Sequence, residues 1–383
     1  MTRLSRYVTR SYVCPPVTHV EKFVEWLLAL GARAGKHVVY PTSDEGAYVL
    51  SAHQAELSKY FALYQPPFET ILRILDKKAL LEAGKAAGFD VPETWFPETA
   101  ADFDRAAHEA DGPLMIKPRT QIFLNPHKKG ATAPRDPALT REAYAKFARE
   151  NRYGSAVADR MPELARPVLQ RYYPEAAEAI SSITGFRDRD GKNLVLFGAV
   201  KVLQIPRRMG VGLCFERSDV APGVRAAVAR LLADLGYHGV FEMELIRARD
   251  KLLLIDMNPR FYNQMALDIA RGLPLPLMAY AAALGDEAEV ARLVAGVPSG
   301  EATYAFCNSV GLRMLVGAQR LTGAMSAEDA RGWRGWMKER GGALVDSARD
   351  QDDPAPMWAG TLGQVYGCLR HPRAFLRMIA LDR

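Results

Sequence analysis

The sequence predicts a mixed α/β protein in three parts. Between residues 17 and 75, segments with helical periodicity alternate with short apolar segments typical of buried strands. Strand-like runs recur among helices up to about residue 285, and the remaining pattern is largely helical. We therefore expect a small N-terminal α/β domain with a parallel sheet (1–75), a larger central domain (76–285) and a mainly helical region (286–383).

Composition limits the class of protein. At 383 residues the chain is too long for one ordinary core. It is 49% hydrophobic and 25% charged, as soluble globular enzymes are. No apolar run reaches the roughly 18–20 residues of a membrane span. The net charge of +6 suits an anionic ligand such as a nucleotide, but its diffuse distribution predicts no nucleic-acid partner.

Cysteine usage indicates a reducing compartment. Cys14, Cys214, Cys307 and Cys368 are scattered and lack the spacing of a zinc site or a disulfide framework. The first residues carry charge without a following apolar block, so no signal peptide is predicted. We expect a cytoplasmic protein.

Each element is predicted from its periodicity and its end signals. In the N-terminal part we expect a helix over Val20–Leu30, a strand over His37–Tyr40 and a helix over Ala47–Leu57. In the central part we expect helices over Ala79–Ala87 (ended by Gly88), Arg141–Arg149 and Val224–Leu235, strands over Pro113–Pro118, Pro167–Gln170 and Leu194–Gln204, and a polar loop over Arg119–Pro137.

A hairpin with acidic positions is the most informative segment. Val240, Phe241 and Met243 are apolar on one side, and Leu252–Ile255 are apolar on the other. The polar stretch Arg247–Lys251 between them predicts a turn. With the turn centred near Asp250, Glu244 lies opposite Asp256, and Glu242 lies opposite Asn258. Side chains two apart on a strand share a face, so Asp256 and Asn258 point the same way.

Carboxylates in direct opposition repel each other unless a cation neutralises them. Two carboxylates and an amide oxygen on one face suit Mg²⁺, which prefers oxygen ligands and commonly takes one or two carboxylates with substrate phosphates. A salt-bridged surface hairpin is the alternative, but it does not explain why Glu244 and Asp256 interrupt apolar strands.

The segment Ile255-Asp-Met-Asn-Pro-Arg-Phe261 resembles the metal-binding hairpin of the ATP-grasp superfamily, which includes biotin carboxylase, carbamoyl-phosphate synthetase and D-alanine ligase. The resemblance covers about residues 35–285. It implies a two-lobed ATP-grasp domain in which Glu244, Asp256 and Asn258 bind Mg²⁺, or Mn²⁺, on the phosphates of ATP. It also implies that Arg260 stabilises acyl-phosphate chemistry.

The resemblance assigns nucleotide contacts upstream of the hairpin. Lys117, at the end of an apolar strand, would lie near the α-phosphate and adenine, and Lys77 near the phosphates. Taken alone, each lysine would be read as a solvated surface residue. Lys129 lies in the position of the family's phosphate-covering loop, although a plain loop explains this segment equally well.

The run Gln170-Arg-Tyr-Tyr-Pro174 occupies the position of the family's inter-lobe hinge, whose backbone contacts adenine. Gln170, Arg171 and Tyr172 are therefore assigned to the nucleotide, although the family usually has Glu where this chain has Arg171. Glu178 stands where the ribose-binding acid would be, with a solvent-facing glutamate as the alternative.

Four further residues are assigned to substrates or the phosphoryl group. Lys201 is a cation inside the apolar run Phe197–Gln204, and the resemblance makes it a γ-phosphate or substrate contact. Arg207 and Arg208 are candidates for a substrate carboxylate, or else form a surface turn. Glu242 is an additional acid by hairpin parity alone.

The N-terminal domain departs from the family. Val38-Val-Tyr-Pro-Thr-Ser-Asp-Glu45 resembles its strand and turn, but the glycine-rich opening strand is missing. That lobe is expected to be abbreviated, or the true start lies upstream. Trp333, Trp336 and the basic stretch Arg370–Arg383 look amphipathic, which favours packing against the body over membrane contact.

The resemblance therefore implies an ATP-dependent carboxylate–amine ligase that forms C–N bonds through an acyl phosphate. The phrase Arg260–Gln264 followed by Arg271–Pro274 looks most like the D-aspartate-ligase-like members, and the biotin-carboxylase signature after the Asn is absent. Small carboxylates and amines are the expected partners, and the sequence allows a homodimer. The alternative is a nucleotide-binding ATP-grasp protein without turnover, acting as a sensor or partner subunit.

Overall fold

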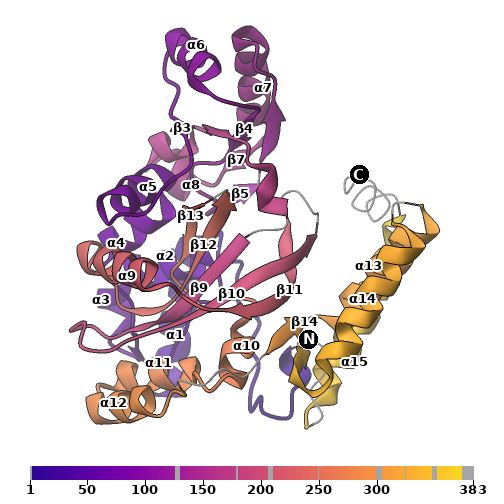
Figure 1. Ribbon diagram of the computed structural model, residues 1–383. Helices are drawn as coiled ribbons and strands as arrows, with labels where there is room; N and C mark the ends of the chain where they lie inside the picture. Colours follow the sequence, from indigo (N-terminus) through magenta and orange to yellow (C-terminus); the bar gives the residue numbers. More distant parts are fainter. Residues whose placement is uncertain are drawn as a thin grey trace.

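The computed structural model describes residues 2–125, 130–177, 180–205, 210–248, 250–298, 304–323, 325–346 and 352–372. The chain forms a mixed helix-and-sheet molecule with open sheets, which confirms the expected fold class. A seven-stranded sheet lies at the centre, and a lobe with a four-stranded sheet lies above it in Figure 1.

The N-terminal part contains one pair of parallel strands packed among helices. Strand β1 pairs in parallel with β2, so the predicted parallel sheet is present but small. Ser43 caps α2 by accepting a hydrogen bond from the backbone N–H of Gly46. The elements are η1 (Thr2–Leu4), α1 (Val20–Ala34), β1 (His37–Val38), α2 (Asp44–Ala52), α3 (Gln54–Leu57), β2 (Phe61–Ala62) and α4 (Phe68–Leu75).

Helix α5 (Lys77–Ala86) begins two residues before the predicted start at Ala79 and ends one residue before the predicted end at Ala87. The Asp76 side chain caps its start by accepting from the backbone N–H of Lys78. Gly88 follows the helix with φ +95°, a conformation that favours glycine. This helix fixes Lys77 at the edge of the large sheet, because α5 packs on β13.

The small lobe is an antiparallel sheet in the order β3-β8-β4-β6, covered by α6 and α7. The predicted polar loop over Arg119–Pro137 is wrong in part, because β6 pairs with β4 inside it. Three residues are too few to show a period in the sequence. The elements are β3 (Thr94–Trp95), α6 (Ala100–Glu109), β4 (Leu114–Lys117), β5 (Leu124–Asn125), β6 (Ala131–Ala133), α7 (Pro137–Glu150), β7 (Arg152–Tyr153), α8 (Ser155–Ala158), η2 (Pro162–Ala165) and β8 (Val168–Arg171).

The large sheet runs in the order β13-β12-β9-β10-β11-β14-β15, and all its pairs are antiparallel except β14 with β15. One face packs against α4, α5 and α9 in the main hydrophobic core. The elements are η3 (Pro174–Ala177), β9 (Ile180–Arg187), β10 (Leu194–Ile205), β11 (Val211–Ser218), α9 (Pro222–Asp234), β12 (Gly239–Ala248) and β13 (Lys251–Asn258).

The chain after the hairpin is mainly helical, as expected, but it also adds β14 and β15 to the large sheet. Trp333 and Trp336 pack against the core beneath α13, which agrees with the expected contact with the body. The elements are α10 (Met265–Ala270), α11 (Leu275–Leu284), α12 (Glu287–Ala295), β14 (Ala305–Cys307), α13 (Ser309–Leu321), α14 (Ala327–Arg340), η4 (Gly341–Ala343), β15 (Leu344–Asp346) and α15 (Pro354–Arg370).

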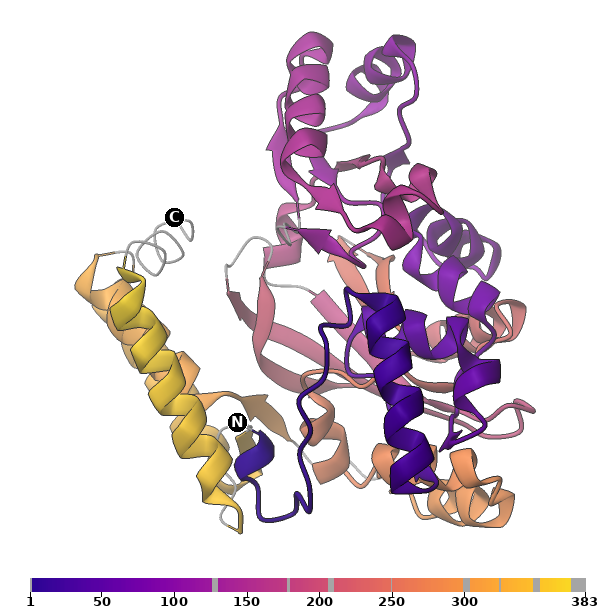
Figure 2. The same ribbon diagram turned by 180° about the vertical axis from the view of Figure 1, so that it is seen from behind.

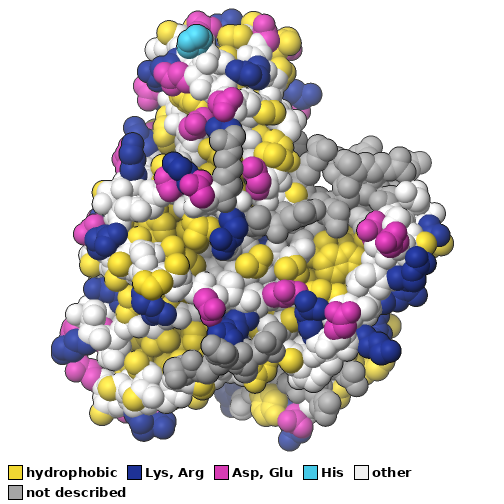
Figure 3. All heavy atoms as spheres, in the orientation of Figure 1, with side chains coloured by type: hydrophobic (Ala, Val, Ile, Leu, Met, Phe, Trp, Pro, Cys, Tyr) yellow, Lys and Arg dark blue, Asp and Glu magenta, His cyan; other side chains and the backbone are white. Residues whose placement is uncertain are grey.

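The N-terminal segment lies beside the start of the C-terminal helix α15. Figure 2 shows the N-terminal segment next to the start of α15, where the Arg6 backbone N–H donates to Asp353 Oδ1 at 3.1 Å. In the part of the chain that the structure describes, no helix combines the length and apolar character needed to cross a membrane. Acidic and basic side chains are interspersed over the face in Figure 3.

Candidate functional site

A pocket lies between the four-stranded sheet and the seven-stranded sheet. Met115 and Lys117 of β4 line it from the small lobe, and Ile180, Ile246 and Ile255 line it from the large sheet. Met115 and the three isoleucines make the walls of this pocket apolar on both sides. Such an arrangement suits a flat ring, with polar groups at one end to orient it.

The acidic hairpin has the predicted register. Glu244 pairs with Asp256, and Glu242 pairs with Asn258. Glu244 and Asp256 both line the pocket, with side chains 22% and 27% exposed. Two carboxylates therefore face each other at its polar end, each within reach of a ligand.

Two buried lysines neutralise this carboxylate pair. Lys201 Nζ lies 2.6 Å from Glu244 Oε1, and Lys77 Nζ lies 3.2 Å from Asp256 Oδ1. Burial acts to lower the pKa of Lys201, but the nearby carboxylates, Glu244 first, outweigh burial and raise it. Lys201 therefore stays cationic inside the protein, and the same cation can face a phosphate.

Lys117 is held in place by the glutamine predicted to lie at the hinge. Lys117 Nζ donates to Gln170 Oε1 at 2.7 Å, and Gln170 Nε2 donates to Thr94 Oγ1 at 3.0 Å. Gln170 is buried. The side chain of Gln170 thus orients a lysine that lines the pocket, a function that the sequence did not suggest.

Arg171 and Tyr172, which follow Gln170, use their N–H groups within the small lobe. Arg171 N–H donates to Glu93 O at 2.9 Å, and Tyr172 N–H donates to Pro113 O at 2.8 Å. The Arg171 guanidinium pairs with Glu93 at 3.4 Å and with Asp111 at 3.5 Å. Backbone contacts to a ligand at Arg171 and Tyr172 would therefore involve their carbonyl groups.

Arg260 follows the hairpin and points to the N-terminal part of the chain. Its Nε donates to Asp44 Oδ1 at 2.7 Å, and its NH2 group donates to Asn258 Oδ1 at 3.0 Å. Burial acts to lower the pKa of Arg260, but Asp44 and then Glu242 outweigh burial and raise it. Asp256, Asn258 and Arg260 alternate along the chain. Arg260 lies just beyond the end of β13 and contacts the Asn258 side chain, as the two-residue period of a strand predicts.

Glu242 is buried behind this row and is not a pocket residue. Its oxygens accept hydrogen bonds from Ser182 Oγ at 2.7 Å, from Asn258 Nδ2 at 3.0 Å and from Gln264 Nε2. Burial, and secondarily Glu244, raises the pKa of Glu242. Glu242 was predicted to contact a substrate. Its side chain has no surface facing the pocket, because its own hydrogen-bond partners enclose it.

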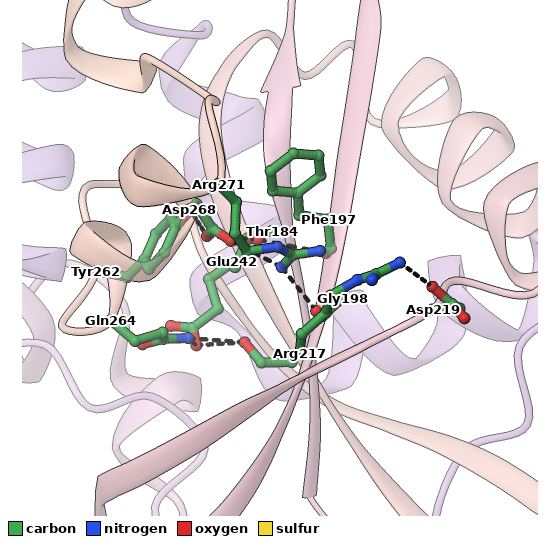
Figure 4. A network of polar contacts seen from close by, with 11 residues as sticks. Thr184, Phe197, Gly198, Arg217, Asp219, Glu242, Tyr262, Gln264, Asp268 and Arg271 are labelled. Carbon is green, nitrogen blue, oxygen red and sulfur yellow. Dashed lines mark hydrogen bonds and ion pairs between the residues drawn. The ribbon is translucent and has the colours of Figure 1, made fainter. Parts of the chain in front are cut away.

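A second buried carboxylate lies beside Glu242 in the network of Figure 4. Asp268 of α10 accepts from Thr184 Oγ1 at 2.8 Å and from Tyr262 Oη at 2.6 Å, and it pairs with Arg271 at 3.3 Å. Burial raises the pKa of Asp268. The hydrogen bond from Thr184 attaches α10 to β9, the strand that pairs with β12 of the hairpin.

The structure brings together most of the predicted site. Glu244, Asp256 and Lys201 meet at the polar end of the pocket, where Lys77 and Lys117 also lie. Asn258 and Arg260 lie one step further along the hairpin. The predicted residues Lys129, Glu178, Arg207 and Arg208 lie outside the described residues.

Sequence reasoning missed the groups that support the site. Asp44, which holds Arg260, stands in the Pro-Thr-Ser-Asp-Glu turn that was noted without a role. Ser182 and Gln264 hold Glu242. A Ser or Thr within a strand facing acidic positions is a signal that could have indicated Ser182 and Thr184.

The donor set fits Mg²⁺. Among the described residues, no group of three or more His, Cys, Asp or Glu is arranged to hold a metal. Two carboxylates are enough for Mg²⁺ when substrate phosphates supply further oxygens. Glu244 and Asp256 provide them in direct opposition, and the Asn258 amide oxygen beside them already accepts from Arg260.

Comparison by sequence gives no match, either to a protein-family model or to a curated protein. Comparison by structure gives many. The biotin carboxylase domain of the Hydrogenobacter thermophilus 2-oxoglutarate carboxylase, solved with MgADP, ADP and bicarbonate, matches with TM-score 0.55 and 17% identity. The match covers 72% of this chain and 59% of that one.

Two further solved enzymes match this chain in fold. N5-carboxyaminoimidazole synthetase from Staphylococcus aureus with ADP matches with TM-score 0.53 and 14% identity, covering 78% of this chain and 69% of that one. L-amino acid ligase from Bacillus licheniformis matches with TM-score 0.52 and 14% identity, covering 72% and 63%. The chain spans less than two thirds of the first and third of these enzymes. At these identities the likeness concerns the fold, and this chain has the ATP-grasp fold.

Proposed function

We propose that this protein is an ATP-dependent ligase that joins a small carboxylate to an amine. One observation carries the proposal. A single pocket between two sheets contains an opposed pair of carboxylates, Glu244 and Asp256, together with the lysines Lys77, Lys117 and Lys201. Alternating cations and carboxylates at the end of an apolar slot suit a polyphosphate nucleotide bound with a divalent cation.

ATP would enter the pocket with its base in the apolar slot. Met115 lies on one side of the slot, and Ile246 and Ile255 lie on the other. Lys117 and Lys77 would then face the phosphates. Because Gln170 already fixes Lys117, that cation is preorganised and loses little conformational freedom on binding.

Mg²⁺, or Mn²⁺, would be held by Glu244 and Asp256, with Asn258 beside them. When bound, the cation supplies charge stabilisation for phosphoryl transfer. The resident partners of the two carboxylates, Lys201 and Lys77, would be redirected toward phosphate oxygens.

The proposed reaction has two steps. A carboxylate oxygen of the first substrate attacks the γ-phosphorus of ATP, and ADP leaves with the electrons of the broken P–O bond. The amine nitrogen then attacks the acyl carbon, loses a proton, and inorganic phosphate leaves. Arg260 would hold the carboxylate and the transferring oxygens together, because a guanidinium can pair with both in a bidentate way.

The supporting comparisons favour ligation over carboxylation only in part. L-amino acid ligase supports an amine acceptor, while the two carboxylating enzymes share the same fold. The hairpin of this chain continues as Arg260-Phe-Tyr-Asn-Gln264, without the biotin-carboxylase signature. We therefore place the proposed reaction with amide-forming ligases.

The test is ADP release measured over a panel of amino acids and small acids, each with and without amines. Hydroxylamine in the same mixtures converts an acyl phosphate to a hydroxamate, which reports the first step directly. Release that needs both an acid and an amine supports the proposal. Tight ATP binding without ADP release or hydroxamate under any combination would instead indicate a nucleotide-binding protein without turnover.

A further inference from the structure

The outer face of α15 is apolar and exposed. Trp358, Leu362, Val365, Tyr366 and Leu369 are 61%, 67%, 41%, 61% and 75% exposed. Their spacing of four, three, one and three residues places them in one stripe along the helix. In Figure 2, α15 lies at the periphery of the molecule, and no other element crosses in front of it.

The stripe is also free of charge. No charged residue occurs from Pro354 to Leu369, whereas the neighbouring helix α14 carries acidic residues in its first turn and basic residues in its last. Single exposed apolar residues are ordinary, but a continuous stripe with large aromatic side chains is typical of an interface. The half-buried side of α15 holds smaller or polar residues such as Thr361 and Cys368.

We propose that this face binds a second copy of the chain, with the two α15 helices antiparallel across a two-fold axis. Leu362 is the midpoint of Pro354–Arg370. With the axis at Leu362, each copy of this leucine meets the other, and Trp358 meets the partner's Tyr366. The same surface then serves both subunits, as a two-fold interface requires.

The ends of α15 favour the antiparallel arrangement. Asp352 lies just before the helix and is exposed, and Arg370 is its last residue and is exposed. Antiparallel pairing places each Arg370 near the partner's Asp352, and it sets the helix dipoles in opposite directions. Parallel pairing would place like charges together at both ends.

The charge pattern of α15 also separates a protein partner from a membrane surface. A helix that binds a membrane surface would instead carry basic residues along its polar side, whereas α15 has only Arg370.

Sedimentation velocity of the full chain over a range of concentrations tests the proposal. We expect a reversible dimer, and we expect Leu362→Arg to raise its dissociation constant by about 30-fold or more, the effect of losing a central contact. Leu321→Arg is the matched control, because Leu321 is 90% exposed on α13 and outside the stripe, and it should leave the constant unchanged. Since both leucines are exposed, neither change should lower the melting temperature of the single subunit.

The orientation is tested by a charge exchange. Arg370→Asp should weaken the antiparallel dimer, and the double variant Asp352→Arg with Arg370→Asp should restore it. A monomeric wild type at every concentration overturns the proposal, as does a dimer that is insensitive to Leu362→Arg. If the wild type is monomeric but binds phosphatidylserine vesicles in a manner lost in Leu362→Arg, the face belongs to a membrane surface and the dimer is wrong.

Discussion

Glu244 and Glu242 lie two residues apart on β12 and point to the same face, yet their surroundings differ. Glu244 is 22% exposed, lines the pocket and pairs with Lys201 at 2.6 Å. Glu242 is 5% exposed and accepts its hydrogen bonds from the neutral groups of Ser182, Asn258 and Gln264. A shift of two residues along one strand thus separates a carboxylate that can face a ligand from one that holds the site together.

The difference extends to the neighbouring acids. Asp256 lies beside Glu244, lines the pocket and has a lysine partner, whereas Asp268 lies beside Glu242, is buried, and is held by two hydroxyl groups and by Arg271. Burial, and secondarily the charge of Glu244, raises the pKa of Glu242, whereas the Lys201 cation acts to lower it. We therefore expect the loss of either carboxylate of the first pair, Glu244 and Asp256, to stop catalysis. A change in the second pair, Glu242 and Asp268, should act through the position of the site residues and the stability of the fold.

The largest effects are expected at the candidate metal-binding residues, beginning with Glu244→Gln. This change removes one carboxylate of the candidate metal pair and the ion pair with Lys201, so ADP formation should fall by about 10³-fold. Steady-state kinetics at several Mg²⁺ concentrations measure it. Glu242→Gln is the matched comparison, with an expected loss of about tenfold. Equal losses in the two variants would abolish the distinction between them.

Asp256→Ala and Asn258→Ala should likewise abolish Mg²⁺-dependent ADP formation with the fold intact. Their shared face opposite Glu244 and Glu242 is the reason. Circular dichroism and thermal melting check the fold, and coupled ADP detection checks turnover. Wild-type turnover in both variants would remove the metal assignment altogether.

A somewhat smaller loss is expected for Arg260→Ala. Arg260 does not line the nucleotide pocket, since it is held between Asp44 and Asn258. ATP affinity should therefore change little, while kcat should fall by about 10²–10³ because one preorganised donor is lost. Arg260→Lys should recover little, since an ammonium cannot pair bidentately.

Arg225→Ala, exposed on α9, is the control for Arg260→Ala. Weaker ATP binding with unchanged turnover at saturation would make Arg260 a nucleotide anchor instead.

Binding alone should change in Lys117→Ala. The affinity for a non-hydrolysable ATP analogue, measured by isothermal titration, should fall by about 10- to 100-fold, the equivalent of one charged contact. Gln170→Ala should give a smaller loss, because it only frees Lys117 from its orienting bond. Lys85→Ala, exposed on α5, should bind like the wild type. An affinity within about twofold of wild type in Lys117→Ala would return this lysine to a surface role.

The sequence predicts local relations in this site better than distant ones. The pairing of Glu244 with Asp256 follows from a two-residue period and one polar turn, and both are local signals. The ion pair of Lys77 with Asp256 and the bond of Arg260 to Asp44 join residues far apart in the chain, so no local signal indicates them. Strand β9, an interior strand of the large sheet, was missed for a related reason. Its Ser, Thr and Gly residues lower its apolar character, yet Ser182 and Thr184 face the buried acids.

The smallest effect is the pH dependence of stability at Glu242. A carboxyl group whose pKa is raised on folding binds a proton more readily in the folded state than in the unfolded state, where its pKa is about 4.3. As pH rises above that value, the unfolded state loses its proton first, and the free energy of unfolding falls until the folded pKa is passed.

In Glu242→Gln this pH-dependent loss of stability is absent. The amide that replaces the carboxyl group cannot accept from all the groups that surround the glutamate, so the variant should be less stable by about 1–3 kcal/mol near pH 4. The deficit should then shrink as the pH rises above the unfolded pKa of about 4.3. Urea unfolding at a series of pH values measures the difference, with Glu25→Gln on the exposed side of α1 as the control. A deficit that grows with pH would mean that Glu242 is stabilised as a carboxylate, and that it belongs with Glu244 rather than apart from it.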